Sequence, residues 1–183
     1  MARIEPIEPQ NASPTVGALY DQLRKDLNIE PNNFFKTMGH SPVLLKPLID
    51  FSFAMLENGR LERRLKEWVI LQIGRLNDCP YVYEAHKHAL SRVIMRDVLD
   101  DRPQALDMSS LSDDEKLAIR YAHQVTANTV DDATFEELRT RFDQEQIVEL
   151  TVLASYYNFI CRAVNALDVQ TDVMTFLEPQ EAR

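Results

Sequence analysis

Apolar residues recur at helical spacing along most of this chain, as in residues 14–27, where they fall three or four positions apart. This spacing gathers them on one face of a helix, whereas a half-buried strand would alternate apolar and polar residues between turns. The sequence has no alternating stretch of that kind, and glycine, which often interrupts helices, occurs only four times in 183 residues. The sequence therefore predicts an all-α protein.

Breaks in the apolar pattern divide the chain into segments. The expected helices cover 14–27, 42–57, 60–77, 80–95, 112–128, 130–142 and 144–167. Residues 32–40 are expected to form a connector with a short turn, and the polar residues 96–110 are expected to form a loop. Residues 1–13 contain prolines and are expected to form an extended N-terminal arm. Residues 14–183 are expected to form a single all-α domain.

Several residues have the chemistry and the spacing of helix caps. Ser41 followed by Pro42 is typical of an N-cap with proline at the first helical position. Ser112, with Glu115 three residues later, matches the capping box, in which each side chain binds the other residue's amide. Asp143 is expected to cap the last long helix. These residues predict where three of the helices begin.

The charge balance excludes some classes of partner. Twenty basic and twenty-nine acidic residues give a formal net charge of −9. Phosphate backbones and anionic lipid surfaces would be repelled, so neither nucleic acid nor a membrane is an expected partner. The sequence also lacks a run of eighteen uninterrupted apolar residues, so no membrane span is predicted. A small-molecule substrate remains compatible with this charge, because local charge can differ from the total.

The two cysteines, Cys79 and Cys161, lie far apart in the sequence and do not form a disulfide framework. Residues 1–13 lack the apolar core of a signal peptide. These features predict a cytoplasmic protein with reduced thiols. His40, His88 and His123 show no metal-ligand spacing, so we expect no metal site and no cofactor.

The stretch 75–88, "RLNDCPYVYEAHKH", carries the densest group of reactive side chains. If residues 80–95 are helical, Cys79 and His86 are seven residues, or about two turns, apart and share one face. The preceding helix is joined by a very short turn, so it should run antiparallel and bring Glu67 within sideways reach. The sequence thus predicts that a carboxylate, an imidazole and a thiol meet at one buried spot, with Glu67, Cys79 and His86 as candidate catalytic residues.

Each of these residues also has a purely structural interpretation. Cys79 could be a small buried hydrophobic residue, and His86 a histidine that serves packing alone. Glu67 could pair with Arg63, four residues earlier on the same helix. The stretch "RLERRLK" is expected to be a solvated basic patch. Alternatively, Arg63, Arg64 or Lys66 attracts a carboxylate-bearing substrate beside Glu67.

Lys66-Glu67 followed by "WVILQIGRLNDCPYVYEAHKHAL" resembles the carboxymuconolactone decarboxylase family, which includes the alkylhydroperoxidase D (AhpD) branch. Glu67, Cys79, Tyr81 and His86 match its motif, and Tyr83 stands where many members have tryptophan. The stretches "PNNFFKTMGHSPVLL", "LSDDEKLAIRYAHQVT" and "YYNFICRAVNALDV" resemble larger members of the family. The resemblance covers roughly residues 14–170.

This resemblance implies an AhpD-like helical bundle that assembles as a trimer or hexamer. In the peroxidase branch it implies a proton relay from glutamate through histidine to cysteine, which carries over to Glu67, His86 and Cys79. That branch uses two cysteines three positions apart, with the second as the attacking thiol, and here the second position is Val82. Cys161 could act as a distant resolving thiol, but in an apolar helix it is expected to serve packing.

The decarboxylase branch differs in another way, because its small members carry arginine and glutamate at the positions of Cys79 and Tyr81. Neither branch is therefore matched in full. Candidate substrate-binding residues around the predicted site are Tyr81, Tyr83, Arg63 and Lys66.

Three functions follow as hypotheses. The first is acid–base chemistry on a small carboxylated substrate of the lactone or muconate type, with His86 moving the proton and Glu67 orienting it. The second is thiol-dependent reduction of hydroperoxides through Cys79, without the usual second cysteine. The third is a non-catalytic oligomer that binds a ligand. The segment 150–164 is apolar on nearly all sides, which predicts a central helix or a subunit contact and supports a homo-oligomer.

Overall fold

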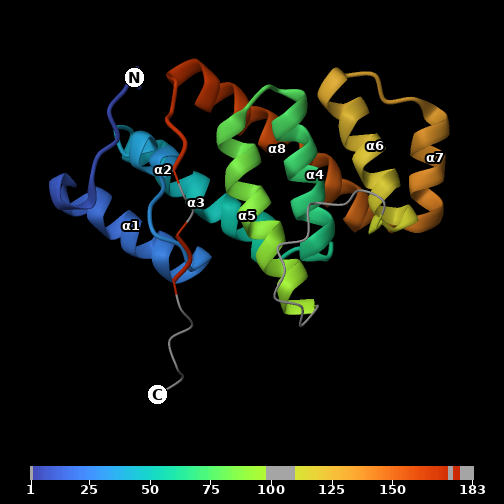
Figure 1. Cartoon of the computed structure of the whole chain (residues 1–183), viewed down its shortest axis with the longest axis horizontal. Coiled ribbons are helices and arrows are strands. Elements are labelled where there is room, and N and C mark those ends of the chain that lie inside the picture. The colour runs from blue at the N-terminus through green and yellow to red at the C-terminus, as the bar shows by residue number, and fades with distance from the viewer. Residues whose placement is uncertain (1, 98–109, 173–174, 178–183) are drawn as a thin grey trace. The chain divides into compact units, whose positions relative to one another are not determined.

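The structure is a computed structural model that describes residues 2–97, 110–172 and 175–177 (Figure 1). Its regular elements are helices, and the described residues contain a single isolated bridge, between Ile29 and Phe176, so the all-α prediction is confirmed. The chain forms two compact units, one of residues 1–58 and 166–183 and one of residues 59–165. Compact units of this kind can belong to one domain, so the predicted arm (1–13) and single domain (14–183) stay predictions.

The first unit contains a short 3-10 helix and three α-helices. These are η1 (Pro9–Asn11), α1 (Pro14–Leu27), α2 (Asn33–Met38) and α3 (Pro42–Glu57). The predicted apolar face of α1 is buried. The side chain of Ser13 accepts a hydrogen bond from the Val16 amide and so caps α1. This unit carries none of the candidate catalytic residues.

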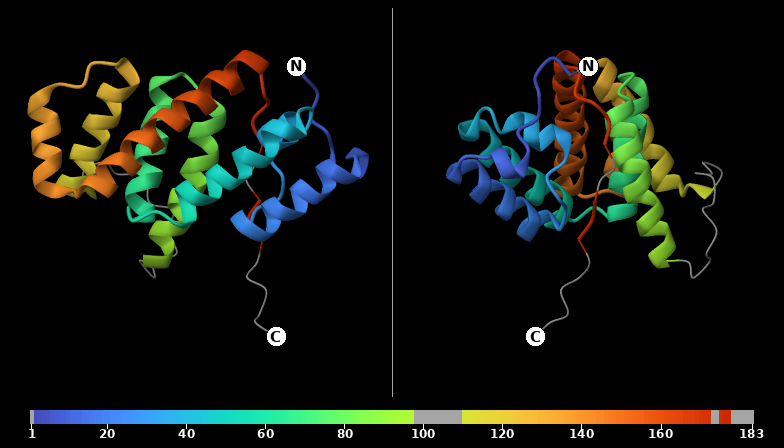
Figure 2. Two further views of the ribbon diagram at one scale, coloured as in Figure 1. Left: turned by 180° about the vertical axis from the view of Figure 1, so that it is seen from behind. Right: turned by 60° about the vertical axis from the view of Figure 1, so that its left-hand side comes forward.

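The second unit contains four complete helices and most of a fifth. They are α4 (Arg63–Leu76), α5 (Pro80–Asp97), α6 (Asp113–Ala127), α7 (Asp132–Arg141) and α8 (Gln144–Leu167). Helices α4 and α5 lie side by side and run antiparallel, and α6 and α7 form a second such pair (Figures 1 and 2). The largest fully buried side chains here include Trp68, Ile70, Leu71, Ile73, Leu90, Leu138 and Leu150. All the candidate catalytic residues belong to this unit.

Glycine allows α4 and α5 to approach closely beside the turn that joins them. A Cβ added at Gly74 would lie 3.0 Å from the backbone nitrogen of Tyr83 in α5. Any side chain at this position would press on the backbone of α5, which cannot rotate aside as a side chain can. The absence of a side chain at Gly74 therefore helps to fix the spacing of the two helices that carry Glu67, Cys79 and His86.

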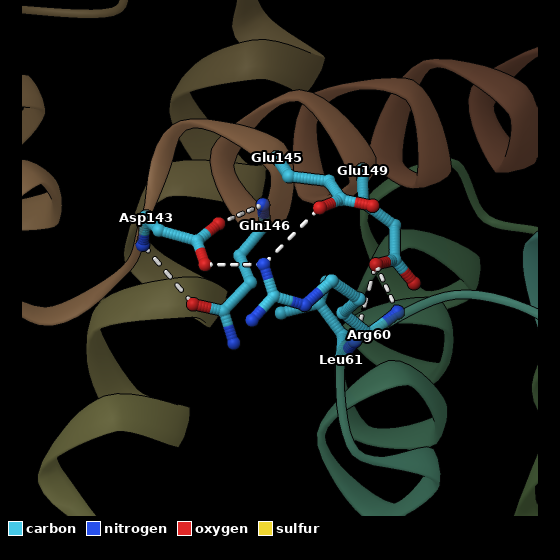
Figure 3. Close-up of polar contacts among 6 residues, drawn as sticks. All are labelled: Arg60, Leu61, Asp143, Glu145, Gln146 and Glu149. Atoms are coloured by element: carbon cyan, nitrogen blue, oxygen red, sulfur yellow. Dashed lines mark hydrogen bonds and ion pairs between the residues drawn. The ribbon is translucent and has the colours of Figure 1, made fainter.

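Two of the predicted elements are wrong. Residues 32–40 are not only a connector, because the side chain of Asn32 accepts a hydrogen bond from the Phe35 amide and starts the six-residue helix α2. Residues 60–62 do not belong to the helix that was expected to begin at Arg60. Glu149 binds the backbone amides of Arg60 and Leu61 through Oε2, at 2.7 and 3.1 Å, so this segment forms a loop attached to α8 (Figure 3).

The predicted caps have mixed outcomes. Ser112 and Glu115 form the expected capping box, and the Asp143 carboxylate accepts a hydrogen bond from the Gln146 amide at the start of α8. Ser41 precedes Pro42 as predicted, but its side chain makes no capping hydrogen bond, so that part of the prediction is wrong. The predicted loop over 96–110 lies mostly outside the described residues, since 98–109 are not described and Asp97 still belongs to α5.

Helix α8 is long and apolar enough to cross a membrane by length and composition alone. However, 56% of its most apolar stretch is buried inside the protein, as in the core helix of a soluble protein. Its outer face exposes Val148 and Phe159. A single helix of this kind is weak evidence, so the absence of a membrane span and the homo-oligomer both stay predictions.

Candidate active site

The α4–α5 turn is the base of the site, and α8 holds it in place. Asp78 adopts a left-handed backbone conformation, with φ of 45°, which reverses the chain direction before Cys79. The Asn77 side-chain amide donates to Asn158 Oδ1 of α8 at 2.9 Å, and the Asn165 amide donates to the Asn77 carbonyl at 3.0 Å. These two bonds place one face of α8 against the residues that lead into Cys79.

Glu67 is fully buried and lies between two donors. Its Oε2 accepts from His86 Nδ1 at 2.7 Å, across from α4 to α5. Its Oε1 accepts from Arg63 Nε at 2.6 Å, one turn earlier on α4. The predicted approach of Glu67 to His86 is therefore present, and so is the pairing with Arg63 that was offered as the structural alternative. Both oxygens of the carboxylate are thus used.

The carboxylate of Glu67 is stabilised in its charged form. Burial alone would raise the pKa of Glu67, but His86 and Arg63 together outweigh this effect, so that the pKa is lowered from its usual value. Since an ionised carboxylate can only accept hydrogen bonds, His86 Nδ1 must carry the hydrogen. The other ring nitrogen, Nε2, is then the atom through which His86 can take up or release a proton.

Cys79 meets Cys161 of α8 rather than His86. Both thiols are buried, and they share a hydrogen bond. This bond, together with the amides of Val82 and Tyr81 at the start of α5, outweighs the opposing effect of burial and lowers the pKa of Cys79 to about 7. Cys161 lies within a continuous helix, where backbone amides are already used, so Cys79 is the thiolate and Cys161 is the donor.

The pKa of Cys161 is shifted in the opposite direction to that of Cys79. The pKa of Cys161 is raised, first because its thiol donates to Cys79 and second because it is buried beside that negative charge. Cys161 is completely buried, as its expected packing role requires, and it also faces the thiol of Cys79. Sequence spacing could not reveal this contact, since it joins helices that are far apart in the chain.

Tyr157 and Asn158 of α8 belong to the site and were missed by the sequence analysis. The Tyr157 ring meets the His86 ring edge-on, with centroids 4.9 Å apart. Burial, and then the charge of Glu67, raise the pKa of Tyr157 well above its usual value, so its phenol stays protonated. Both residues lie one turn from Cys161, on the same side of α8. Polar residues repeating every three or four positions in an apolar helix were the available signal.

The candidate substrate-binding residues lie in different environments. Tyr81 is buried, and its amide rather than its phenol is what acts on Cys79. Tyr83 is half-buried, with the Lys87 ammonium 6.0 Å from the centre of its ring. Arg63 is partly exposed and bound to Glu67. Roles of these residues in substrate binding stay predictions.

Lys66 does not lie in a solvated patch. Its side chain is buried, and its ammonium pairs with Glu149 of α8 at 2.7 Å. The expectation of a solvated basic patch is therefore wrong for Lys66, because this residue faces the interior of the unit rather than water. Its role as a substrate-binding residue, by contrast, is not tested and stays a prediction.

The predicted contact among the carboxylate, the imidazole and the thiol is thus present only in part. Glu67 and His86 are in contact, whereas Cys79 is about two turns, or roughly 10 Å along α5, from His86. Two residues of α8 that are one turn apart line this interval: Tyr157 contacts His86, and Cys161 contacts Cys79. The described residues contain no group of three or more His, Cys, Asp or Glu side chains that could hold a metal ion. The arrangement can therefore combine a thiolate with a buried proton-transfer pair.

No family model matches the chain. A 60-residue segment is 42% identical to the uncharacterized protein YnjA of Escherichia coli (strain K12). That segment makes up 32% of this chain and spans only a third of the length of that relative, 33%.

Comparison of structures covers nearly the whole chain. An AhpD-core, peroxidase-related protein of Ralstonia eutropha JMP134 aligns with a TM-score of 0.74 and 18% identity over 93% of this chain and 92% of that one. A cysteine-to-alanine variant of the debrominase Bmp8, in complex with 2,3,4-tribromopyrrole, aligns with a TM-score of 0.71 and 17% identity, over 92% and 91%. A putative antioxidant defence protein of Agrobacterium tumefaciens gives 0.60 and 23%, over 74% and 95%. At these identities the likeness is one of fold.

Proposed function

We propose that this chain, which has the AhpD-like fold, is a thiol-dependent oxidoreductase that reduces small hydroperoxides through Cys79. The observation that carries the proposal is the contact between Cys79 and Cys161, which gives the site a second thiol despite Val82. A thiol with a pKa of about 7 is substantially ionised at neutral pH, and the thiolate is the form that attacks peroxides. The peroxidase-related structures on this fold support the same class of chemistry.

In the proposed reaction the Cys79 thiolate attacks one oxygen of the hydroperoxide. A sulfur–oxygen bond forms, the oxygen–oxygen bond breaks, and the released alkoxide takes a proton to become an alcohol. His86, held by Glu67 through Nδ1 and roughly 10 Å along α5 from Cys79, is proposed to pass that proton on from Nε2 through water when its ring is doubly protonated. Hydroperoxide reduction and acid–base chemistry on a carboxylated substrate would both use the Glu67–His86 pair. The debrominase on this fold, whose cysteine-to-alanine variant is in complex with 2,3,4-tribromopyrrole, supports a small-molecule substrate.

Reduced protein treated with one equivalent of hydrogen peroxide is expected to lose free thiol rapidly and saturably, beginning at Cys79. Cys79→Ser should abolish this loss, because serine is not a thiolate at neutral pH. His86→Ala should slow it by at most roughly 10²-fold, the lower end of general acid catalysis, because His86 lies about two turns from Cys79. Stopped-flow thiol titration and intact mass measure both effects. A wild-type Cys79 that stays inert, or a Cys79→Ser protein that consumes peroxide equally fast, would refute the proposal.

A second candidate is acid–base chemistry on a small carboxylated substrate, and the buried Glu67–His86 contact is the observation that favours it. Wild type and His86→Ala would be screened against lactones and muconate-type acids, by loss of substrate absorbance. This candidate predicts turnover in the wild type that falls at least about 100-fold in the variant. Equal inactivity of both proteins on every acid would exclude these substrates. Stabilisation by an acid that stays unchanged would instead favour a non-catalytic binding role.

The proposed setting is a reducing one. Both cysteines are free thiols, which suits the cytoplasm, and the reaction needs a thiol reductant there. We also propose a homo-oligomer, a trimer or hexamer, in which the exposed Val148 and Phe159 of α8 would lie at subunit contacts. No nucleic acid or membrane partner is proposed.

A further inference from the structure

We propose that Cys161 is a second redox-active residue of this site: once Cys79 has been oxidised, Cys161 attacks it and closes a Cys79–Cys161 disulfide between α5 and α8. This inference rests on the proposed function, because it starts from a Cys79 that has reacted with a hydroperoxide. It adds a residue from a different helix to the site and gives the reaction a defined oxidised product.

The two thiols lie together in the interior of the second unit. Cys79 and Cys161 are 1% and 0% exposed, and they share a hydrogen bond. Asn158 and Asn165, one turn before and one turn after Cys161, both bind the α4–α5 turn that leads into Cys79. The segment of α8 that carries Cys161 is thus attached on both sides of the thiol. A disulfide bond needs the sulfurs about 2.05 Å apart, so the reaction must bring two hydrogen-bonded thiols into covalent contact.

Cys79 has no thiol other than Cys161 in the same chain with which to form a disulfide. The chain has two cysteines in its full sequence, and the position three residues after Cys79 is Val82. A local disulfide within α5 therefore cannot form. An oxidised Cys79 can be resolved within one chain only by Cys161.

Charge sets the order in which the two thiols react. The thiolate of Cys79 is one cause of the raised pKa of Cys161, both as its hydrogen-bond acceptor and as a nearby negative charge. Oxidation of Cys79 to a neutral sulfenic acid removes that charge. The Cys161 thiol then loses its proton more easily, so it becomes nucleophilic only after Cys79 has reacted. The order of the two steps follows from the pairing itself.

Each step of the proposed reaction conserves atoms and electrons. The hydroperoxide gives one oxygen to Cys79, which becomes a sulfenic acid, and leaves as an alcohol after taking a proton. Cys161 then attacks the Cys79 sulfur: the sulfur–sulfur bond forms, the sulfur–oxygen bond breaks, and the hydroxide leaves as water with the Cys161 proton. In sum, two thiols and one hydroperoxide give a disulfide, an alcohol and water. An external dithiol restores the two thiols by exchange and is itself oxidised to a disulfide.

The first test uses the unmodified protein, so it does not depend on any variant folding. Reduced wild type is treated with one equivalent of hydrogen peroxide, blocked with an alkylating agent and digested without reduction. The proposal expects a cross-linked pair of peptides containing Cys79 and Cys161, with an intact mass about 2 Da below that of the reduced protein. Dithiothreitol, as the dithiol probe, should remove the cross-link.

The second test uses Cys161→Ala, with Cys161→Val to fill the same space. In these variants oxidation should stop at Cys79, with a mass gain of about 16 Da at one equivalent and further oxidation in excess peroxide. Peroxide turnover supported by dithiothreitol should fall at least about 10-fold. Far-ultraviolet circular dichroism and the melting temperature check that each variant is folded.

The outcomes separate the two proposals. If Cys79 is not oxidised at all, the proposed function fails and this inference fails with it. If wild-type Cys79 gains oxygen while Cys161 remains a free thiol, the proposed function survives and only the disulfide is refuted. Cross-links between two copies of Cys79 in the wild type would refute it as well.

Discussion

Replacing Glu67 with glutamine is expected to lower the free energy of unfolding by about 3 kcal/mol, although the side chain hardly changes in size. Both oxygens of the Glu67 carboxylate accept hydrogen bonds, one from His86 and one from Arg63. Glutamine has one accepting oxygen and an amide that only donates, so either Arg63 faces another donor in a buried place or the His86 ring must change tautomer to accept from the amide. Urea denaturation of wild type and variant measures the difference.

Glu62→Gln is the matched control, because Glu62 lies on the exposed side at the start of the same helix. It should change stability by no more than about 0.5 kcal/mol. If both glutamine variants lose the same small amount, the buried contacts of Glu67 do not carry the stability assigned to them.

The cost of Glu67→Gln should also depend on pH in a definite direction. The folded pKa of Glu67 lies below its usual value of 4.5, so folding favours the ionised form. This contribution is fully present above the pKa of the unfolded chain and is lost as the pH falls through the folded pKa. The difference between wild type and variant should therefore be constant near neutral pH and shrink below about pH 4.5. A difference that grows on acidification would contradict the ionised assignment.

The Lys66–Glu149 ion pair is expected to give the second large effect. Lys66→Met removes a buried cation and leaves the Glu149 carboxylate without it, at a cost of about 3–5 kcal/mol. Glu149→Leu should cost at least as much, because Glu149 also accepts from the amides of Arg60 and Leu61 (Figure 3). Thermal unfolding followed by circular dichroism measures both variants.

The double variant Lys66→Met/Glu149→Leu makes this prediction specific. Removing both charges leaves no unpaired buried ion, so the double variant should lose less than the sum of the two single losses. Lys116→Met, in an exposed pair with Asp113 at 3.5 Å, is the control and should cost less than about 1 kcal/mol. Additive losses in the double variant would show that the two charges do not interact.

The sequence was sufficient for the features that depend on local spacing. The helical periodicity and the capping box at Ser112 predicted most elements, because these signals lie within one helix. The contact between Glu67 and His86 was also predictable, since a very short turn forces α4 and α5 to be antiparallel neighbours. Inference of this kind extends only to elements that are adjacent in the chain.

Contacts of α8 could not be predicted in the same way. Cys161 and Glu149 bind residues that are more than eighty positions away, and no spacing rule fixes which face of a long apolar helix meets which neighbour. Lys66 was expected in water because it stands in a basic stretch, whereas its actual partner belongs to α8. The start of α4 was misplaced for the same reason, since Glu149 binds the preceding amides.

The buried side chain of Asn158 fixes how α8 is rotated about its own axis. Its side-chain nitrogen donates to Thr126 Oγ1 at the end of α6, and its oxygen accepts from Asn77. A helix with apolar neighbours on most sides could turn about its own axis at little cost in free energy, since one apolar contact would replace another. An amide with its donor and acceptor already matched to opposite neighbours permits a single rotational setting. That one polar group, buried where only a hydrophobic side chain would be expected, keeps the sulfur of Cys161 aimed at its counterpart.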